Sequence, residues 1–318
     1  MRVLLTGASS FTGYWFVREL TEAGHTVFAT YTRASVDEYE GVRGKRVSRL
    51  SGVCQQEFAC RFGDDRFLDL VGEVNPDVLC HHAAEVTEYK SPDFDYAAAL
   101  QANTLRLPEV LRQLNAVDCR RVVLTGTVFE EYEGAGNEPS VSFSPYGLSK
   151  ALTDRVYRHF VCAAEMSLGK FVIPNPFGPL EEPRFTAYLA RCWNAGDVAQ
   201  VRTPAYVRDN IHASLLAKAY RLFVESLPET GFTKINPSGY VETQGAFATR
   251  FANELRKRLP WACELEFGDQ FQFDEPPVRI NTTPIDVVGL NWDESRAWDA
   301  IAEYYETELA SGGARSDA

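Results

Sequence analysis

The feature that most constrains the fold is a short apolar segment, Arg2 to Thr6, followed by a turn of small residues from Gly7 to Gly13. The next segment, residues 14–23, carries apolar side chains at helical spacing, and Gly24 ends it. A second apolar run follows from Thr26 to Thr30. This order predicts a β-α-β unit, whose two strands lie parallel because the helix crosses between them.

The turn itself has the composition of a phosphate-binding loop. Small residues allow a pyrophosphate to approach the backbone amides and the positive end of the following helix. A tight strand-to-helix turn without a ligand is the alternative interpretation, and Ser10 stands where a middle glycine is usual. The candidate cofactor-binding residues here are Gly7, Ser9, Ser10, Phe11, Thr12 and Gly13.

The end of the second predicted strand bears on the choice of dinucleotide. A carboxylate at this point would bind the adenosine ribose hydroxyls of NAD, whereas a basic residue favours the 2′-phosphate of NADP. The chain has Thr32 and Arg33 there, so we expect both to contact the cofactor. NADP(H) is slightly favoured over NAD(H), unless Arg33 is only a solvated loop residue.

The alternation of strands and helices continues to residue 173. It predicts an α/β fold with a Rossmann-type, doubly wound parallel sheet over residues 1–173. Residues 174–318 have more prolines and aromatics, and we expect a smaller, interleaved, substrate-binding α/β part with some segments returning to the first domain. Residues 311–318 are expected to be a disordered tail. Further strands are expected at 78–81, 121–124 and 170–173, and helices at 67–74, 96–114, 146–164, 185–194, 210–225, 243–258 and 293–309.

Charge and cysteine usage narrow the possible partners. A net charge of −12 argues against nucleic acid as a partner, since a phosphate backbone requires a broad basic surface. The seven cysteines show no C-x-x-C spacing, which fits reduced thiols in the cytoplasm and gives no zinc signature. No apolar run is long enough to cross a membrane. His81 and His82 point to opposite faces of a strand, so no metal site is predicted.

A tyrosine and a lysine one helical turn apart indicate acid-base chemistry. Tyr146 and Lys150 share one face if the run after Pro145 forms a helix, and proline is common at a helix start. A nearby ammonium would lower the pKa of the phenol by stabilising the phenolate. The alternative is a surface helix on which the lysine only covers apolar side chains.

Together these pieces resemble the extended short-chain dehydrogenase/reductase superfamily, in its group of nucleotide-sugar epimerases, dehydratases and 4-ketoreductases. The resemblance spans nearly the whole chain. Besides the phosphate turn and the Tyr146/Lys150 pair, it rests on His82-Ala83-Ala84, Asn103, Thr125-Gly126-Thr127, Asn175-Pro176-Phe177-Gly178-Pro179 and Arg208-Asp209-Asn210-Ile211-His212.

The resemblance implies a role for each matched residue. Thr127 would hydrogen-bond the substrate oxygen, Tyr146 would donate or accept the proton, and Lys150 would bind the nicotinamide ribose. Ala83, Ala84 and Asn103 would contact the cofactor. Asn175 and Arg208 would hold the diphosphate of the substrate, and Arg279 is a further candidate from its place after a proline turn, with a surface salt bridge as its alternative.

The residues after Thr127 bear on the reaction. Sugar 4,6-dehydratases resemble one another in carrying an Asp or Ser and then a Glu directly after the catalytic threonine. This chain has Val128 and Phe129 there, which disfavours dehydration unless Glu130 takes over. Glu130 and Glu131 could also be paired acid-base carboxylates, or simply charged loop residues. We therefore expect hydride transfer at C4 of a nucleotide-diphosphate sugar, by a 4-ketoreductase or a 4-epimerase, in a homodimer. A dehydratase and a non-catalytic dinucleotide sensor are the alternatives.

Overall fold

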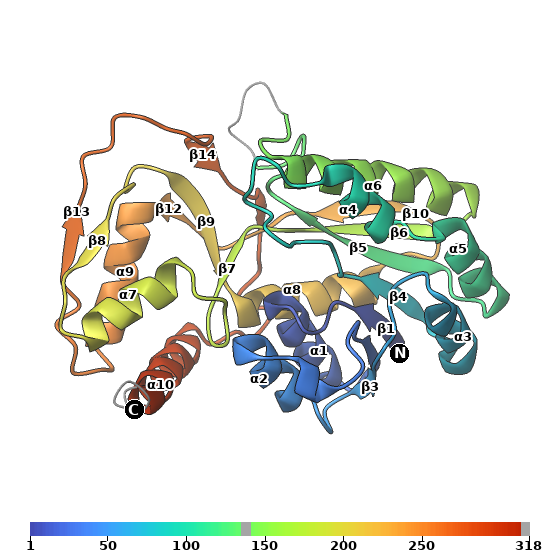
Figure 1. The fold of residues 1–318 in the computed structure, drawn as a ribbon, viewed down its shortest axis with the longest axis horizontal. Coiled ribbons are helices and arrows are strands. Elements are labelled where there is room, and N and C mark those ends of the chain that lie inside the picture. The colour runs from blue at the N-terminus through green and yellow to red at the C-terminus, as the bar shows by residue number, and fades with distance from the viewer. Residues whose placement is uncertain (135–140, 313–318) are drawn as a thin grey trace.

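A parallel seven-stranded sheet forms the centre of the molecule. It belongs to a computed structural model, which describes residues 1–134 and 141–312 (Figure 1). The sheet order 3-2-1-4-5-6-10 reverses direction between β1 and β4, which makes the fold doubly wound. Its strands, in spatial order, are β10 (Gly231–Ile235), β6 (Ser167–Ile173), β5 (Arg121–Thr127), β4 (Val78–His81), β1 (Arg2–Thr6), β2 (Thr26–Thr30) and β3 (Gln55–Glu57).

Helices cover both faces of this sheet. Helices α1 (Phe11–Glu22), α2 (Gly41–Arg49) and α8 (Ala213–Ser226) pack on one face, where the rings of Phe16 and Tyr220 stack with centroids 3.8 Å apart. The other face is covered by α3 (Asp65–Val74), α5 (Leu107–Ala116) and α6 (Pro145–Ala163), with α4 (Tyr96–Asn103) against α6. A short 3-10 helix, Val36–Glu38, lies beside α2 on the first face. Burial on both faces explains the almost continuous apolar runs of the strands.

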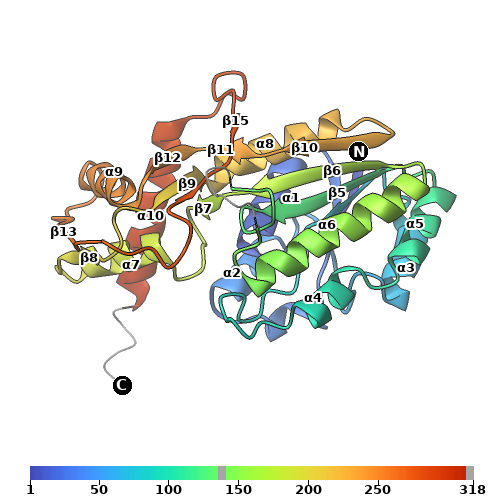
Figure 2. The same cartoon turned by 90° about the horizontal axis from the view of Figure 1, so that it is seen from above.

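The C-terminal part is smaller and interleaved with the first. Its own core lies between three helices and two small sheets, at the end of the molecule away from the seven-stranded sheet (Figure 2). Two of its elements, α8 and β10, return to the main sheet. The remaining elements are α7 (Phe185–Asn194), α9 (Gln244–Arg256), α10 (Glu294–Gly312), β7 (Asn175–Phe177), β8 (Ala199–Val201), β9 (Val207–His212), β11 (Pro237–Ser238), β12 (Tyr240–Thr243), β13 (Leu265–Phe267), β14 (Val278–Arg279) and β15 (Thr283–Pro284).

The structure confirms the α/β Rossmann-type fold and corrects three predicted boundaries. The helix expected from residue 210 begins at Ala213, because residues 210–212 belong to strand β9. The single helix expected over 96–114 is two helices, because Pro108 lacks an amide hydrogen and cannot continue one, and Arg106 takes a positive φ of 47°. Residues 311 and 312 belong to α10, while the rest of the expected tail lies outside the described residues. Within 1–134 and 141–312, no helix has the length and apolarity needed to span a bilayer.

Candidate active site

A cavity of about 1520 Å³ opens at the carboxyl ends of β1, β4 and β5, where the strand order reverses. This is the position at which open parallel sheets bind ligands. The cavity brings together residues that are far apart in the sequence. Gly13 is the one predicted site residue that does not line it. The predicted site residues that do line it are Gly7, Ser9, Ser10, Phe11, Thr12, Thr32, Arg33, Ala83, Ala84, Asn103, Thr127, Tyr146, Lys150, Asn175, Arg208 and Arg279.

The turn at residues 7–13, the predicted phosphate turn, requires glycine at both of its ends. Gly7 has φ of 81°, and a Cβ there would lie 2.7 Å from the amide nitrogen of Ala83. A Cβ on Gly13 would lie 2.3 Å from the Gly7 carbonyl oxygen, so Gly13 serves close packing of the turn. Ser10 caps α1 by accepting a hydrogen bond from the Gly13 amide at 3.1 Å. The turn therefore presents the start of α1 to the cavity, which suits a pyrophosphate.

His82 connects the phosphate turn to the end of β5. Its Nε2 lies 2.9 Å from the Ser10 hydroxyl and 3.0 Å from that of Thr12, and its Nδ1 lies 2.9 Å from the Thr125 hydroxyl. Burial, together with the charge of Lys150, lowers the pKa of His82 to about 3, so the ring is neutral. The sequence placed His82 only within a motif. Its role as a link between two halves of the cavity depends on contacts that no local pattern encodes.

Arg46 is a second residue that the sequence did not single out. Its side chain is 1% exposed and lines the cavity from α2. The guanidinium donates to the Ser9 carbonyl at 2.9 Å, the Leu180 carbonyl at 2.8 Å and the Glu182 carboxylate at 2.7 Å. Arg46 therefore ties the phosphate turn to the segment that follows β7.

The predicted acid-base residues converge at the end of β5. Thr127 ends this strand, and Tyr146 and Lys150 occupy successive turns at the start of α6. Ser144 caps that helix by accepting from the Gly147 amide at 3.1 Å. Gly147 lets α6 begin close to the strand, because a Cβ there would lie 2.1 Å from the Phe129 carbonyl oxygen. Both the cap and the glycine are local sequence signals that position Tyr146.

The surroundings of Tyr146 act on its pKa in the direction opposite to the one expected. Burial among the rings of Tyr89, Phe94 and Phe129 raises the pKa of the phenol, and the negative charge of Glu130 acts in the same sense. Burial also lowers the pKa of Lys150. In the protein alone, Tyr146 is therefore held in its protonated form at neutral pH.

The two glutamates after Thr127 point to different places. Glu130 is 2% exposed and forms an ion pair with Lys170 at 2.6 Å. Glu131 pairs with Arg155 on α6 at 2.8 Å. Of residues 128–131, only Phe129 lines the cavity. The two carboxylates therefore form no acid-base pair at the site.

Two buried arginines meet one carboxylate at the far end of the cavity. Arg208 and Arg279 lie 3.1 Å and 3.0 Å from Glu275. Arg208 also donates to the Pro276 and Pro277 carbonyls, and Arg279 lies over the ring of Phe129 at 4.2 Å. Burial lowers the pKa of Arg279 to about 10, so it stays charged at neutral pH. The pair forms a concentrated positive site in an acidic protein.

Asn103 and Arg33, two predicted cofactor-binding residues, differ in exposure, since Asn103 is buried and Arg33 is exposed. Asn103 is buried, accepts from the Glu85 amide at 3.0 Å and donates to the Thr153 hydroxyl, so it joins α6 to the loop after β4. Arg33 is exposed, and its backbone amide donates to the Tyr39 hydroxyl.

Comparison with known proteins gives a consistent match. The model of the NAD dependent epimerase/dehydratase family matches residues 3–233. UDP-glucose 4-epimerase of Mycolicibacterium smegmatis is 25% identical over 337 residues, covering 99% of this chain and 97% of the relative.

Solved structures with a similar fold include two UDP-glucose 4-epimerases. UDP-glucose 4-epimerase of Thermus thermophilus, in complex with NAD, is 20% identical with a TM-score of 0.68, over 96% of this chain and 99% of that one. The Bifidobacterium longum enzyme, in complex with NAD⁺ and UDP, is 17% identical with a TM-score of 0.70, over 98% of this chain and 100% of that one.

These findings contradict the expected preference for NADP(H). The matching family is described as NAD dependent, and the two solved neighbours contain NAD or NAD⁺. The prediction rested on Arg33, whose side chain is exposed after β2. Arginines are mostly exposed in folded proteins, so an exposed arginine after β2 does not by itself select a 2′-phosphate.

Proposed function

The chain belongs to the NAD dependent epimerase/dehydratase family, and from this premise we propose that it is a C4 epimerase of a nucleotide-diphosphate sugar. The observation that carries the proposal is the convergence of Thr127, Tyr146 and Lys150 in the cavity that also holds the phosphate turn. A dinucleotide sensor would have no use for this acid-base set. The cavity is also large enough for a dinucleotide and a sugar nucleotide together.

The residues present fit NAD. The phosphate turn, whose Gly7 and Gly13 leave no room for a Cβ, would receive the pyrophosphate, and Lys150 would bind the nicotinamide ribose. When bound, NAD would supply the acceptor for the C4 hydride and its return to the opposite face of the sugar.

The chain's own residues would accept and return the proton of the C4 hydroxyl. Tyr146 takes a proton from the C4 hydroxyl in the first half of the reaction and returns it to the oxygen in the second. The protonated form favoured by burial suits the return step. The first step requires the phenolate, which the charge of Lys150 would stabilise. The Thr127 hydroxyl hydrogen-bonds the same substrate oxygen and polarises the carbonyl.

The surroundings of Thr127 weigh against dehydration. Removal of water needs a second acid-base group at the sugar, and Val128 and Glu130 are buried away from the cavity. Phe129 presents an aromatic ring there instead. A carboxylate committed to Lys170 at 2.6 Å cannot also serve the substrate.

Arg208 and Arg279 would hold the diphosphate of the substrate. Their guanidinium groups share one anion, the Glu275 carboxylate, and a diphosphate offers more oxygens to the same donors. Asn175, which lines the cavity beside them, would complete this part of the site. UDP is the nucleotide of the similar proteins named above and is the first to test.

The test is to incubate the purified protein with UDP-glucose or UDP-galactose and follow the anomeric signals of both sugars by NMR. The proposal predicts interconversion without added reductant and without release of NADH. Absence of interconversion, together with reduction of a UDP-4-keto sugar that consumes one added NADH or NADPH per sugar, would identify a 4-ketoreductase instead. Loss of water from the sugar would identify a dehydratase.

We also propose a homodimer that pairs through α4 and α6, the helices carrying Asn103 and the Tyr146/Lys150 pair. Leu148 is exposed on α6 and Tyr96 is exposed on α4, which gives each helix an apolar side chain at the surface. Multi-angle light scattering should report twice the mass of 35.6 kDa. A mass of one chain would reject the dimer.

A further inference from the structure

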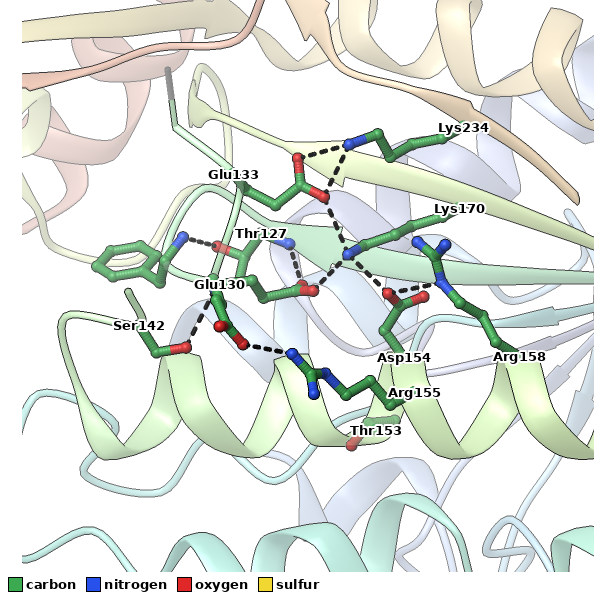
Figure 3. Close-up of polar contacts among 12 residues, drawn as sticks. Thr127, Glu130, Glu133, Ser142, Thr153, Asp154, Arg155, Arg158, Lys170 and Lys234 are labelled. Atoms are coloured by element: carbon green, nitrogen blue, oxygen red, sulfur yellow. Dashed lines mark hydrogen bonds and ion pairs between the residues drawn. The ribbon is translucent and has the colours of Figure 1, made fainter. Parts of the chain in front are cut away.

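A buried lysine and three carboxylates form a charged cluster directly behind the candidate active site (Figure 3). Lys170 lies in the middle of β6 and is 2% exposed. Its ammonium nitrogen is 2.6 Å from Glu130 Oε2, 3.0 Å from Glu133 Oε1 and 3.2 Å from Asp154 Oδ2. Such a group is costly to desolvate, and apolar side chains of similar volume often give equal stability. Its presence beside Thr127 therefore calls for a functional explanation.

The cluster joins the elements that carry the acid-base residues. Asp154 lies on α6, two turns after Tyr146 and one turn after Lys150, and side chains four residues apart share a helical face. Glu130 and Glu133 lie in the segment that follows β5. Two outer ion pairs extend the cluster, from Asp154 to Arg158 and from Glu133 to Lys234. Lys170 thus holds α6 and the end of β5 at a fixed separation.

Glu130 makes the contact that reaches the active site. While its Oε2 faces Lys170, its Oε1 accepts a hydrogen bond from the Thr127 amide at 2.7 Å. That amide belongs to Thr127, the last residue of β5, which lines the cavity. The carboxylate therefore fixes the backbone from which the Thr127 side chain projects.

Gly126, which precedes Thr127, leaves the space that the Glu130 carboxylate occupies. A Cβ on Gly126 would lie 2.9 Å from Glu130 Oε1 and 2.8 Å from Cε of Lys170. Any other residue at this position would push the ion pair away from the strand. The Thr125-Gly126-Thr127 run is thus matched to Glu130 as well as to the cavity.

The charge of Glu130 also acts on both residues of α6. Its negative charge acts on Tyr146 and Lys150, and the charges of Lys170 on β6 and Asp154 on α6 also act on Lys150. The negative charge raises the pKa of the Lys150 ammonium, which opposes the effect of burial. It also raises the pKa of the Tyr146 phenol.

We propose that Glu130 is a positioning residue: its carboxylate fixes Thr127 at the end of β5 behind the acid-base residues, and Lys170 holds it in place. The positioning role rests on the proposed acid-base function of Thr127, Tyr146 and Lys150. Glu130 itself touches neither substrate nor cofactor, since it lies outside the cavity lining.

The variant Glu130→Gln tests this role with little change in shape. The amide can still accept from Thr127, and Lys170 keeps Glu133 and Asp154 as partners, so the fold should survive. Glu131→Gln is the matched control, because it removes the same charge one residue later, where the carboxylate pairs with Arg155. Both variants are compared with the unmodified protein in turnover, in its pH dependence, and in hydrogen exchange of the peptide spanning 124–130.

For Glu130→Gln we expect kcat to fall about tenfold with KM within twofold, because a charge-assisted hydrogen bond becomes a neutral one. The acidic limb of the kcat/KM profile, which reports the ionisation of the phenol that the first step requires, should move to lower pH, since the phenol loses a nearby negative charge. Exchange at 124–130 should accelerate about tenfold. Glu131→Gln should match the unmodified protein in all three.

Two results would overturn the role: unchanged exchange at 124–130 in Glu130→Gln, or an active enzyme whose pH profile does not move. Failure of the proposed function is recognised separately. The epimerase proposal fails if the unmodified protein converts no UDP-sugar. The positioning of Thr127 by Glu130 still stands in that case if hydrogen exchange of the 124–130 peptide is faster in Glu130→Gln than in Glu131→Gln.

Discussion

The guanidinium of Arg46 lies 2.7 Å from the Glu182 carboxylate, and this pair joins the cofactor side of the cavity to the segment after β7. Arg46 comes from α2 of the first domain, whereas Glu182 belongs to the C-terminal part. The same guanidinium holds the Ser9 carbonyl in the phosphate turn. One buried side chain thus connects the two parts that line the cavity.

Replacing Arg46 with methionine should lower the free energy of unfolding by about 3 kcal/mol, because buried carbonyls at Ser9 and Leu180 lose their donors. Urea denaturation measures this loss. Arg49→Met, on the exposed side of the same helix, should change the free energy of unfolding by less than about 0.5 kcal/mol. Equal effects of the two substitutions would contradict the role of Arg46.

Glu275 should compete with the substrate diphosphate for Arg208 and Arg279. Removing its charge by Glu275→Gln frees both guanidinium groups, so we expect UDP to bind about threefold to tenfold more tightly in calorimetric titrations. Asp274→Asn removes the same charge one residue earlier and should leave the UDP affinity unchanged. Weaker binding to Glu275→Gln would mean that the carboxylate orders the arginines and does not oppose the ligand.

Stability should fall as the solution is acidified. Burial lowers the pKa of His81, His82 and His212 to about 3, against about 6.5 in the unfolded chain. Between these values the unfolded chain binds more protons, so the free energy of unfolding decreases as pH falls from about 6.5 towards 3. Glu181 opposes this trend, because burial raises its pKa to about 7 and it favours the folded state below that value.

His212→Asn isolates one of these contributions. The His212 side chain caps α8 by accepting from the Ser214 amide, and asparagine can do the same without titrating. The stability lost between pH 7 and pH 5 should shrink by about 2 kcal/mol. His159→Asn, at an exposed position on α6, should leave the pH dependence of urea denaturation as it is. An identical pH dependence in both variants would contradict the assignment.

Local patterns were enough to predict where five strands of the main sheet lie along the chain, namely β1, β2, β4, β5 and β6. They also predicted the turn of small residues after β1 and the helix that carries Tyr146 and Lys150. Each depends on neighbours in sequence: glycines in a turn, a cap before a helix, and apolar spacing. Helix α2 was missed because its sequence is polar and contains two glycines, so it lacks apolar periodicity. Arg46 was missed with it.

The contacts that complete the site could not be predicted in this way. Lys170 falls inside a segment correctly predicted as a strand, and nothing near it in the sequence indicates that Glu130 and Asp154 surround it. The same is true of Glu275 between its two arginines. Pairings between distant residues arise from the topology of the sheet, and the effect of burial on Tyr146 follows from them.

The proposed mechanism is tested most directly by the rate at which Tyr146→Phe interconverts UDP-glucose and UDP-galactose, measured beside its affinities for NAD and UDP. We expect a rate about a thousandfold lower than that of the unmodified protein, because the proton has no carrier. Both affinities should stay within twofold, since the hydroxyl is the only group removed. An undiminished rate in Tyr146→Phe would contradict the proposed mechanism.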